Sequence, residues 1–300
     1  MARAPQDLSI RQLQYVVAVA DSLGFHRAAE RCHVSQPTLS SQIKEIEDVL
    51  GVAIFERDKR RVLVTETGQA IVARARLVLL AVDELLATAE QHKDPFAATV
   101  RIGVIPTIAP YLLPEITPAV MAKHSKLKLV FREEKTEDVV RDLKEGRLDA
   151  GLVAVVPEVG EFAVDVIGQD PFVVALPKAH PLARKKSVRL EDLATEPVLL
   201  LDDGHCLRSQ ALELCSQVGA RETDLRATSL ATLVQMVSLG TGVTLLPKLA
   251  VAVENRRGQI EVRPIAGGAP SRELAFVWRR GSPFEHVFRA ITAASKKSLR

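Results

Sequence analysis

The residues best placed to do chemistry are two cysteines in one segment, Cys206 and Cys215. An apolar run over residues 198–201 and a turn precede them, and the pattern predicts a strand followed by a helix. Asp203 or Gly204 would cap that helix, so Cys206 would lie in its first turn. Unpaired amides and the helix dipole favour a thiolate there. Cys206 is therefore a candidate reactive cysteine.

The spacing of the two cysteines restricts how they can react with each other. Nine residues along a continuous α-helix give about 13.5 Å of rise and half a turn. A disulfide needs Cα atoms roughly 4.4–6.8 Å apart. A bond between Cys206 and Cys215 would therefore require the helix to come apart, which predicts a redox switch with a built-in folding change. The alternative is two small buried apolar residues, and this describes Cys215 well in the reduced state.

Side chains near Cys206 could support a thiolate. Three lie in the same segment: His205, Arg208 and Gln210, the last at a spacing that shares a helical face with Cys206. The acidic pair at 202–203 would raise the pKa of the thiol, so a further cation is needed. Arg272 is a candidate for it.

Composition narrows the class of protein. The chain has 300 residues, enough for about two domains, and a net charge of +3, which alone does not indicate nucleic acid. Three cysteines are not a disulfide framework. No apolar run is long enough for a membrane span or signal core, so we expect a cytoplasmic protein. The scattered histidines predict no metal site, and we expect no cofactor.

The amino-terminal third has the pattern of a helix-turn-helix. Apolar spacing predicts helices over 10–23, 25–32 and 35–50, the last capped by Ser35, followed by a hairpin over 54–64. The third helix would offer short polar side chains to base edges and phosphates, and the hairpin a basic tip, as in a winged variant. The candidate DNA-binding residues are Gln36, Pro37, Thr38, Ser40, Ser41, Lys44 and Arg57. Each alone could equally be a solvated surface residue.

A long helix follows from Glu66 to about His92. Its apolar residues recur at three- and four-residue spacing, which is typical of a coiled-coil seam. The small preceding domain cannot cover so wide a stripe, so we expect this helix to pair two copies of the chain. The alternative is a core helix of a larger domain.

These amino-terminal motifs resemble those of LysR-type transcriptional regulators. The resemblance rests on the order and spacing of Ala28-Ala29, residues 34–40, Phe55-Glu56-Arg57 and residues 63–68. It implies a winged helix-turn-helix over residues 1–65 and a linker helix over 66–93 that pairs antiparallel in a dimer. It also implies a homotetramer on promoter DNA and contact with RNA polymerase.

The remaining two thirds alternate strands and helices from residue 100 onward, which predicts a parallel α/β sheet. Residues 169–171 are expected to lead into a strand over 172–176. The family resemblance implies a two-lobed regulatory domain like that of periplasmic binding proteins. It places one lobe at 100–169 plus 273–300 and the other, with both cysteines, at 170–272.

Asp203 to Arg208, with Cys215 beyond, resembles the redox segment of peroxide-sensing members of the family. By this resemblance hydrogen peroxide oxidises Cys206 to a sulfenic acid, and Cys215 resolves it as an intramolecular disulfide. The implied peroxide-binding residues are Thr107, Thr136, His205, Gln210 and Arg272; taken singly, each threonine could instead be a helix cap. Two alternatives stay open: a LysR-type regulator that senses a small organic ligand, and a thiol peroxidase. We expect a regulator and not an enzyme.

Overall fold

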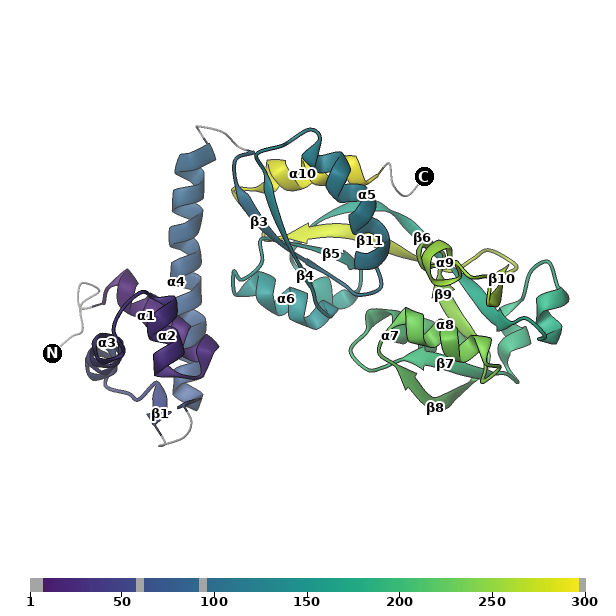
Figure 1. The fold of residues 1–300 in the computed structure, drawn as a ribbon, viewed down its shortest axis with the longest axis horizontal. Coiled ribbons are helices and arrows are strands. Elements are labelled where there is room, and N and C mark those ends of the chain that lie inside the picture. The colour runs from purple at the N-terminus through teal and green to yellow at the C-terminus, as the bar shows by residue number, and fades with distance from the viewer. Residues whose placement is uncertain (1–7, 58–61, 92–95, 297–300) are drawn as a thin grey trace. The chain divides into compact units, whose positions relative to one another are not determined.

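The structure is a computed structural model that describes residues 8–57, 62–91 and 96–296 (Figure 1). It divides the chain into two compact units, Met1–His92 and Lys93–Arg300, and each is described by itself. Within the described ranges, no helix combines the length and the apolar character that crossing a bilayer requires.

The first unit is a winged helix-turn-helix followed by a long helix. Its elements are α1 (Ile10–Ser22), α2 (Phe25–Arg31), α3 (Gln36–Leu50), β1 (Phe55–Arg57), β2 (Val62–Val64) and α4 (Glu66–Gln91). Caps fix the helix starts: Ser35 Oγ accepts from the Thr38 amide at 3.3 Å, and Thr65 Oγ1 accepts from the Gly68 amide at 2.8 Å. The predicted helices, hairpin strands and caps are confirmed here, while the hairpin tip lies outside the described residues.

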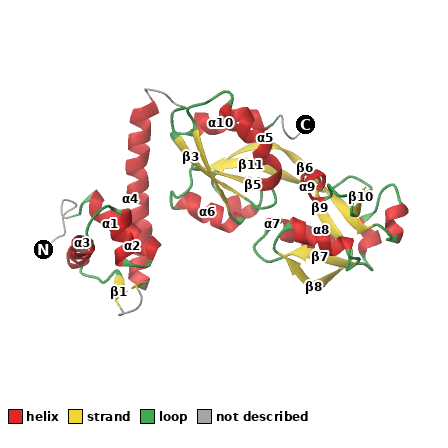
Figure 2. Cartoon of the chain, in the orientation of Figure 1, coloured by secondary structure: helices red, strands yellow, loops and turns green. Residues whose placement is uncertain are grey.

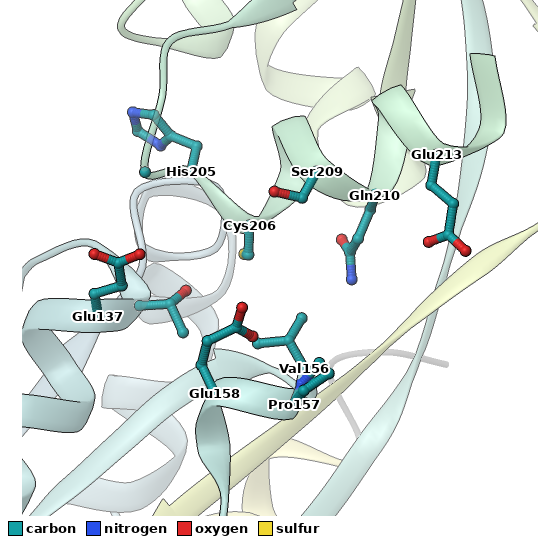
Figure 3. A pocket seen from close by; sticks show the side chains of 11 residues that line it. Glu137, Val156, Pro157, Glu158, His205, Cys206, Ser209, Gln210 and Glu213 are labelled. Carbon is teal, nitrogen blue, oxygen red and sulfur yellow. The ribbon is translucent and has the colours of Figure 1, made fainter. Parts of the chain in front are cut away.

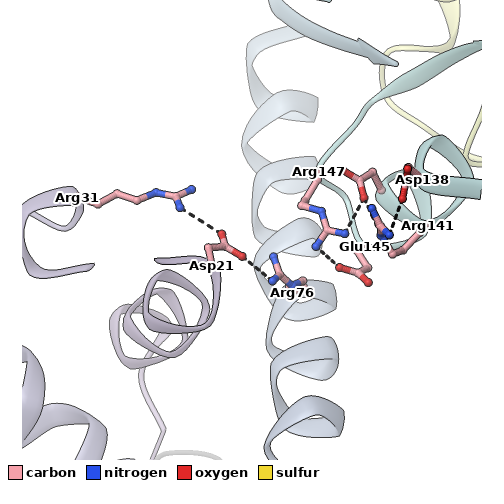
Figure 4. Close-up of polar contacts among 8 residues, drawn as sticks. Asp21, Arg31, Arg76, Asp138, Arg141, Glu145 and Arg147 are labelled. Carbon is pink, nitrogen blue, oxygen red and sulfur yellow. Dashed lines mark hydrogen bonds and ion pairs between the residues drawn. The ribbon is translucent and has the colours of Figure 1, made fainter. Parts of the chain in front are cut away.

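Apolar packing and one acidic residue hold this unit together. Leu39, Ile43 and Ile46 on the inner face of α3 are fully buried against α1 and α2. Asp21 accepts from Arg31 at 3.2 Å and from Arg76 of α4 at 2.6 Å (Figure 4). The helix-turn-helix is therefore joined to the first half of α4.

The apolar stripe of α4 is covered only near its start. Val72 and Ala75 are buried in the unit, whereas Val78, Leu85 and Leu86 are 47%, 69% and 59% exposed. Burial of such side chains gains roughly 1.5–3 kcal/mol each, so a helix that exposes several of them is suited to pairing with another helix.

The second unit has two lobes, visible in Figures 1 and 2. The first contains β3 (Thr99–Val104), β4 (Lys128–Glu133), β5 (Ala150–Ala154) and β11 (Ser271–Trp278), with α5 (Ala109–Met121), α6 (Thr136–Lys144) and α10 (Glu285–Ser295). The second contains β7 (Pro197–Leu201), β8 (Arg221–Ala227), β9 (Thr244–Pro247) and β10 (Ile260–Pro264), with α7 (Cys206–Gln217), α8 (Leu230–Ser238) and α9 (Lys248–Glu254). Each lobe has its own buried apolar core.

One strand passes through both lobes. β6 (Ala163–Pro177) pairs with β11 along its first part and with β9 and β10 along its second. The strand expected over 172–176 is therefore the second part of a longer strand that begins at Ala163. Pro171 lies where the pairing changes from β11 to the second-lobe strands, a position that tolerates a residue without an amide proton.

The predicted parallel sheet is only partly correct. β3 is parallel to β4 and β5, and β7 is parallel to β8. β11 instead enters antiparallel between β5 and β6, and β9 and β10 pair antiparallel with β6. Apolar periodicity marks each strand but does not specify its neighbour, so the return of the distant strand β11 was not visible in the pattern.

Candidate functional site

Helix α7 runs without interruption from Cys206 to Gln217, so the prediction of a continuous helix between the two cysteines is confirmed. Its cap differs from the expected Asp203 or Gly204. Gly204 has a φ of +83°, which closes the turn, and His205 is the extended N-cap residue. Cys206 is thus the first residue of the helix, where the amides lack intrahelical acceptors.

The thiol of Cys206 faces a pocket of about 220 Å³ between the two lobes (Figure 3). The first lobe supplies residues from the start of α6 and from the segment after β5, and the second supplies the first two turns of α7. The lining residues are Thr136, Glu137, Val156, Pro157, Glu158, Gly204, His205, Cys206, Ser209, Gln210 and Glu213. The pocket therefore brings three predicted peroxide-site residues, Thr136, His205 and Gln210, together with Cys206.

Two polar atoms at this pocket lack partners within the described residues. Thr136 is 4% exposed, and neither its Oγ1 nor Gln210 Oε1 has a hydrogen-bond partner. Buried polar atoms normally have partners, and an unpaired one costs about 1–3 kcal/mol. A small ligand with O–H groups in the pocket would remove that cost.

Thr107 and Arg272 are not among the residues that line the pocket. They are bonded to each other in the interior: Arg272 Nη1 donates to Thr107 Oγ1 at 2.7 Å, and Nη2 to its carbonyl at 2.9 Å. Asp170 neutralises the same guanidinium at 2.9 Å, with both side chains at most 2% exposed. Arg272 therefore joins β11 to β6 and to the end of β3, and its effect on Cys206 stays a prediction.

His205 is a poor source of positive charge at neutral pH. Burial, and then the charge of Lys135, lowers the pKa of its imidazole, and Asp202 opposes this only in part. The ring is therefore mainly neutral at pH 7, and it supplies little positive charge for a Cys206 thiolate.

Arg208 belongs to an ionic cluster at the start of α7. Its guanidinium donates to Asp203 at 2.9 Å and to both carboxylate oxygens of Glu222, at 2.6 and 3.1 Å. Arg226 donates to the other oxygen of Asp203 at 2.6 Å. We define Asp203, Arg208, Glu222 and Arg226 as the clasp. Because its cations face carboxylates, Arg208 holds the first turn of α7 to β8 and is not available to support the Cys206 thiolate.

The two cysteines pack in different cores. Cys206 is half-buried and packs against the core of the first lobe, while Cys215 is 2% exposed within the core of the second. Burial raises the pKa of the Cys215 thiol to about 11. In this state Cys215 is a protonated apolar residue.

Several residues of the site were missed from the sequence. Asp170 lies in the segment that leads into the strand expected over 172–176, and Glu158 follows β5 without any motif. Lys135 donates to the carbonyl of Asp203 at 2.6 Å, across the two lobes. The family resemblance, which implies Thr136 as a peroxide-binding residue, was the one signal that pointed to this part of the first lobe.

A second candidate site is the outer face of α3. Gln36, Pro37, Thr38, Ser41 and Lys44 are exposed, and Ser40 is half-buried. The Thr38 and Ser35 hydroxyls are hydrogen-bonded at 2.7 Å. The side chain of Arg57 lies outside the described residues. The exposed face has the length and polarity that entry into a major groove requires.

Among the described residues, no group of three or more histidine, cysteine or acidic side chains is arranged to hold a metal ion.

Comparison with known proteins assigns both parts of the chain. Residues 10–69 match the family described as bacterial regulatory helix-turn-helix protein, lysR family, and residues 93–300 match the LysR substrate binding domain. The DNA-binding transcriptional dual regulator OxyR of Escherichia coli K12 is 42% identical over 293 residues, which cover 97% of this chain and 96% of that protein.

Two solved structures are similar over nearly the whole chain. A full-length OxyR variant from Pseudomonas aeruginosa has a TM-score of 0.82 and 36% identity, covering 96% of this chain and 95% of that chain. A hydrogen-peroxide-bound OxyR variant from Corynebacterium glutamicum has a TM-score of 0.67 and 28% identity, covering 97% and 92%.

Proposed function

Because the chain belongs to the LysR family of transcriptional regulators, we propose that it is a hydrogen-peroxide sensor that controls transcription through Cys206 and Cys215. One observation carries the proposal. Cys206 begins a helix at a small pocket with unpartnered polar atoms, and Cys215 lies buried at the far end of the same helix. The similar OxyR proteins support the same function, because one is named a transcriptional regulator and the structure of another contains hydrogen peroxide.

In the first step the Cys206 thiolate attacks one oxygen of hydrogen peroxide. The S–O bond forms as the O–O bond breaks, the sulfur is oxidised by two electrons, and hydroxide leaves and takes up a proton to become water. Thr136 and Gln210 hold the peroxide, because their unpartnered oxygens can accept hydrogen bonds from its O–H groups. His205 lines the same pocket, and its support of the thiolate is part of the proposal. Thr107 and Arg272 act indirectly, because their buried contacts join β11 and β6 to the segment after β3 in the interior of the first lobe.

In the second step the Cys215 sulfur attacks the sulfenic sulfur, the S–S bond forms, and the sulfenic oxygen leaves as water. The intact helix separates the two Cα atoms by about 13.5 Å, so α7 must unwind. Cys206 leaves the core of the first lobe, and Cys215 leaves that of the second. Once exposed to water, the Cys215 thiol ionises more readily, which favours its attack.

The change in α7 then reaches DNA through the assembly. We infer a homodimer paired through the exposed stripe of α4, two dimers forming a tetramer, and DNA contacts from the outer face of α3. Contact with RNA polymerase and a cytoplasmic location belong to the same proposal. The exposed apolar residues of α4 and the exposed polar residues of α3 support it.

The acidic lining of the pocket disfavours the rival function of sensing an organic acid. Glu137, Glu158 and Glu213 would repel a carboxylate ligand. The similar proteins are transcriptional regulators, which also disfavours a thiol peroxidase.

The test is a DNA footprint on the protein's own promoter region, with reduced and peroxide-treated protein. We expect the wild-type footprint to change on oxidation and that of Cys206→Ser to stay in the reduced pattern. An unchanged footprint in all four lanes would contradict the redox switch.

A further inference from the structure

The pocket at Cys206 carries more negative charge than peroxide binding requires. Glu137 comes from α6, Glu158 from the segment after β5, and Glu213 from α7. All three are exposed, and Figure 3 shows their carboxylates around the opening that leads to Cys206. Within the described part of the chain none of the three carboxylates forms an ion pair. We define these three residues as the acidic ring.

The cations near the pocket do not cancel this charge. Arg208 is bound to Asp203 and Glu222 in the clasp, and Arg272 is bound to Asp170 in the interior. Lys135 keeps its positive charge, because its ammonium donates to the neutral carbonyl of Asp203, and it offsets only part of the charge of the three carboxylates. Burial and the charge of Lys135 keep His205 mainly neutral. The approach to Cys206 is therefore negative overall.

The inner wall of the pocket has a matching chemical preference. Thr136 is more than nine-tenths buried with an unpartnered Oγ1, and Gln210 Oε1 is a buried acceptor without a donor. A neutral peroxide carries two O–H groups that can satisfy these oxygens. An oxyanion offers mainly acceptors and would leave Gln210 Oε1 unsatisfied. Charge at the entrance and hydrogen bonding at the wall thus select the same kind of molecule.

Building on the proposed function, we propose that Glu137, Glu158 and Glu213 make Cys206 selective for small neutral oxidants by excluding anionic ones from the pocket. In water, a unit charge about 8 Å away changes the local concentration of a univalent anion roughly twofold at low ionic strength. Three such charges together exclude an anion about tenfold. Salt reduces this exclusion.

The test uses two alkylating agents of similar size, neutral iodoacetamide and anionic iodoacetate. In both reactions the Cys206 sulfur displaces iodide and forms an S–C bond, so the ratio of the two rates cancels changes in the thiolate fraction. The rates are read at Cys206 by peptide mass mapping of the reduced full-length protein. The variant is Glu137→Gln/Glu158→Gln/Glu213→Gln, which keeps the shape of the side chains.

A matched control removes the same charge elsewhere, through Glu115→Gln/Glu191→Gln/Asp224→Asn at exposed positions outside the pocket. Cys32 is an internal reference, because it lines a different pocket beside Arg11 and Arg31. We expect the iodoacetamide-to-iodoacetate ratio at Cys206 to fall about tenfold at low salt in the ring variant. It should change less than twofold in the control and at Cys32, and added salt should lower the wild-type ratio.

A ratio at Cys206 that is unchanged in the ring variant, or that falls equally in the control variant, would overturn the proposal. The alkylation test needs no peroxide, so its failure would leave the redox switch untouched. Conversely, a protein without a peroxide response could still show the charge selectivity. As a second measure, peroxymonosulfate, an anionic oxidant, should oxidise Cys206 faster in the ring variant relative to hydrogen peroxide. A constant ratio of these two oxidation rates would also count against the acidic ring.

Discussion

The two ends of α7 place the same side chain in opposite environments. At one end Cys206 is half-buried, begins the helix and faces a pocket, and at the other Cys215 is sealed in an apolar core that raises the pKa of its thiol to about 11. Helix position and solvent access thus distinguish a cysteine that can meet an oxidant from one that reacts only after the fold changes. Position along the helix suggests the two roles, and the structure adds that the two thiols pack in the cores of different lobes.

Replacing each cysteine in turn with serine should have the largest effect on the oxidation products. Cys206→Ser should abolish sulfenic acid formation in α7, whereas Cys215→Ser should form it at a rate within about twofold of wild type but form no intramolecular disulfide. Trapping of the sulfenic acid and intact-mass measurement distinguish these products. Sulfenic acid found at Cys215 in the Cys206→Ser variant would break the proposed division of roles.

Burial of the Cys215 thiol should also make the stability of the protein depend on pH. The Cys215 thiol has an ordinary pKa of 9.0 when unfolded and about 11 when folded. Below pH 9 both states keep the proton, so the contribution is constant. As the pH rises from 9 to 11 only the unfolded state loses it, and the free energy of unfolding should fall by up to about 2.7 kcal/mol.

Urea unfolding of the reduced protein across this window measures the effect. Cys215→Ala should lose this component of the pH dependence, and Cys206→Ala, the matched control, should keep it. Equal slopes in all three proteins would show that Cys215 is not sealed from water.

The clasp should make the Cys206 end harder to unwind. Arg208→Met removes the cation that binds Asp203 and Glu222, at a cost of about 2 kcal/mol. The cost falls on the intact helix, so disulfide formation after sulfenic acid formation should be faster, while peroxide attack changes little. Stopped-flow kinetics of the two steps test this. Exposed Arg289, which pairs with Glu285 within α10 and lies over the ring of Trp278 away from α7, provides the control Arg289→Met. If Arg208→Met slows the second step, the clasp guides unwinding instead of opposing it.

The smallest of these effects concerns the wall of the pocket. Thr136→Val keeps the shape of the side chain but removes its unpartnered hydroxyl. The reduced protein should keep its stability, and the rate of peroxide attack should fall about tenfold, equal to 1.4 kcal/mol. Thr107→Val is the comparison, because it instead removes the acceptor of Arg272 Nη1 and should lower stability. A Thr136→Val protein with an unchanged oxidation rate would remove Thr136 from the peroxide site.

Features that depend on neighbouring residues, such as helix starts and the continuity of a helix, could be predicted from the sequence. Ser35 and Thr65 mark helix starts because their hydroxyls accept the first amides, and the continuous α7 follows from the composition of one segment. The peroxide pocket was predicted on the α7 side and, from the first lobe, only at Thr136. Glu158 and Lys135 reach it from the other lobe, through a chain fold that no periodicity specifies. Asp170 was not predicted, because the strand expected here began only at Phe172, whereas β6 begins at Ala163.

The continuity of β6 has a consequence for how far a disturbance in α7 can spread. β6 hydrogen-bonds to β11 in the first lobe and to β9 and β10 in the second, and none of these pairings involves α7. The two lobes should therefore exchange their amide protons as one slowly opening cooperative unit, while α7 opens separately and more often. Such a hierarchy would let the protein lose and regain one helix many times without passing through the globally unfolded state.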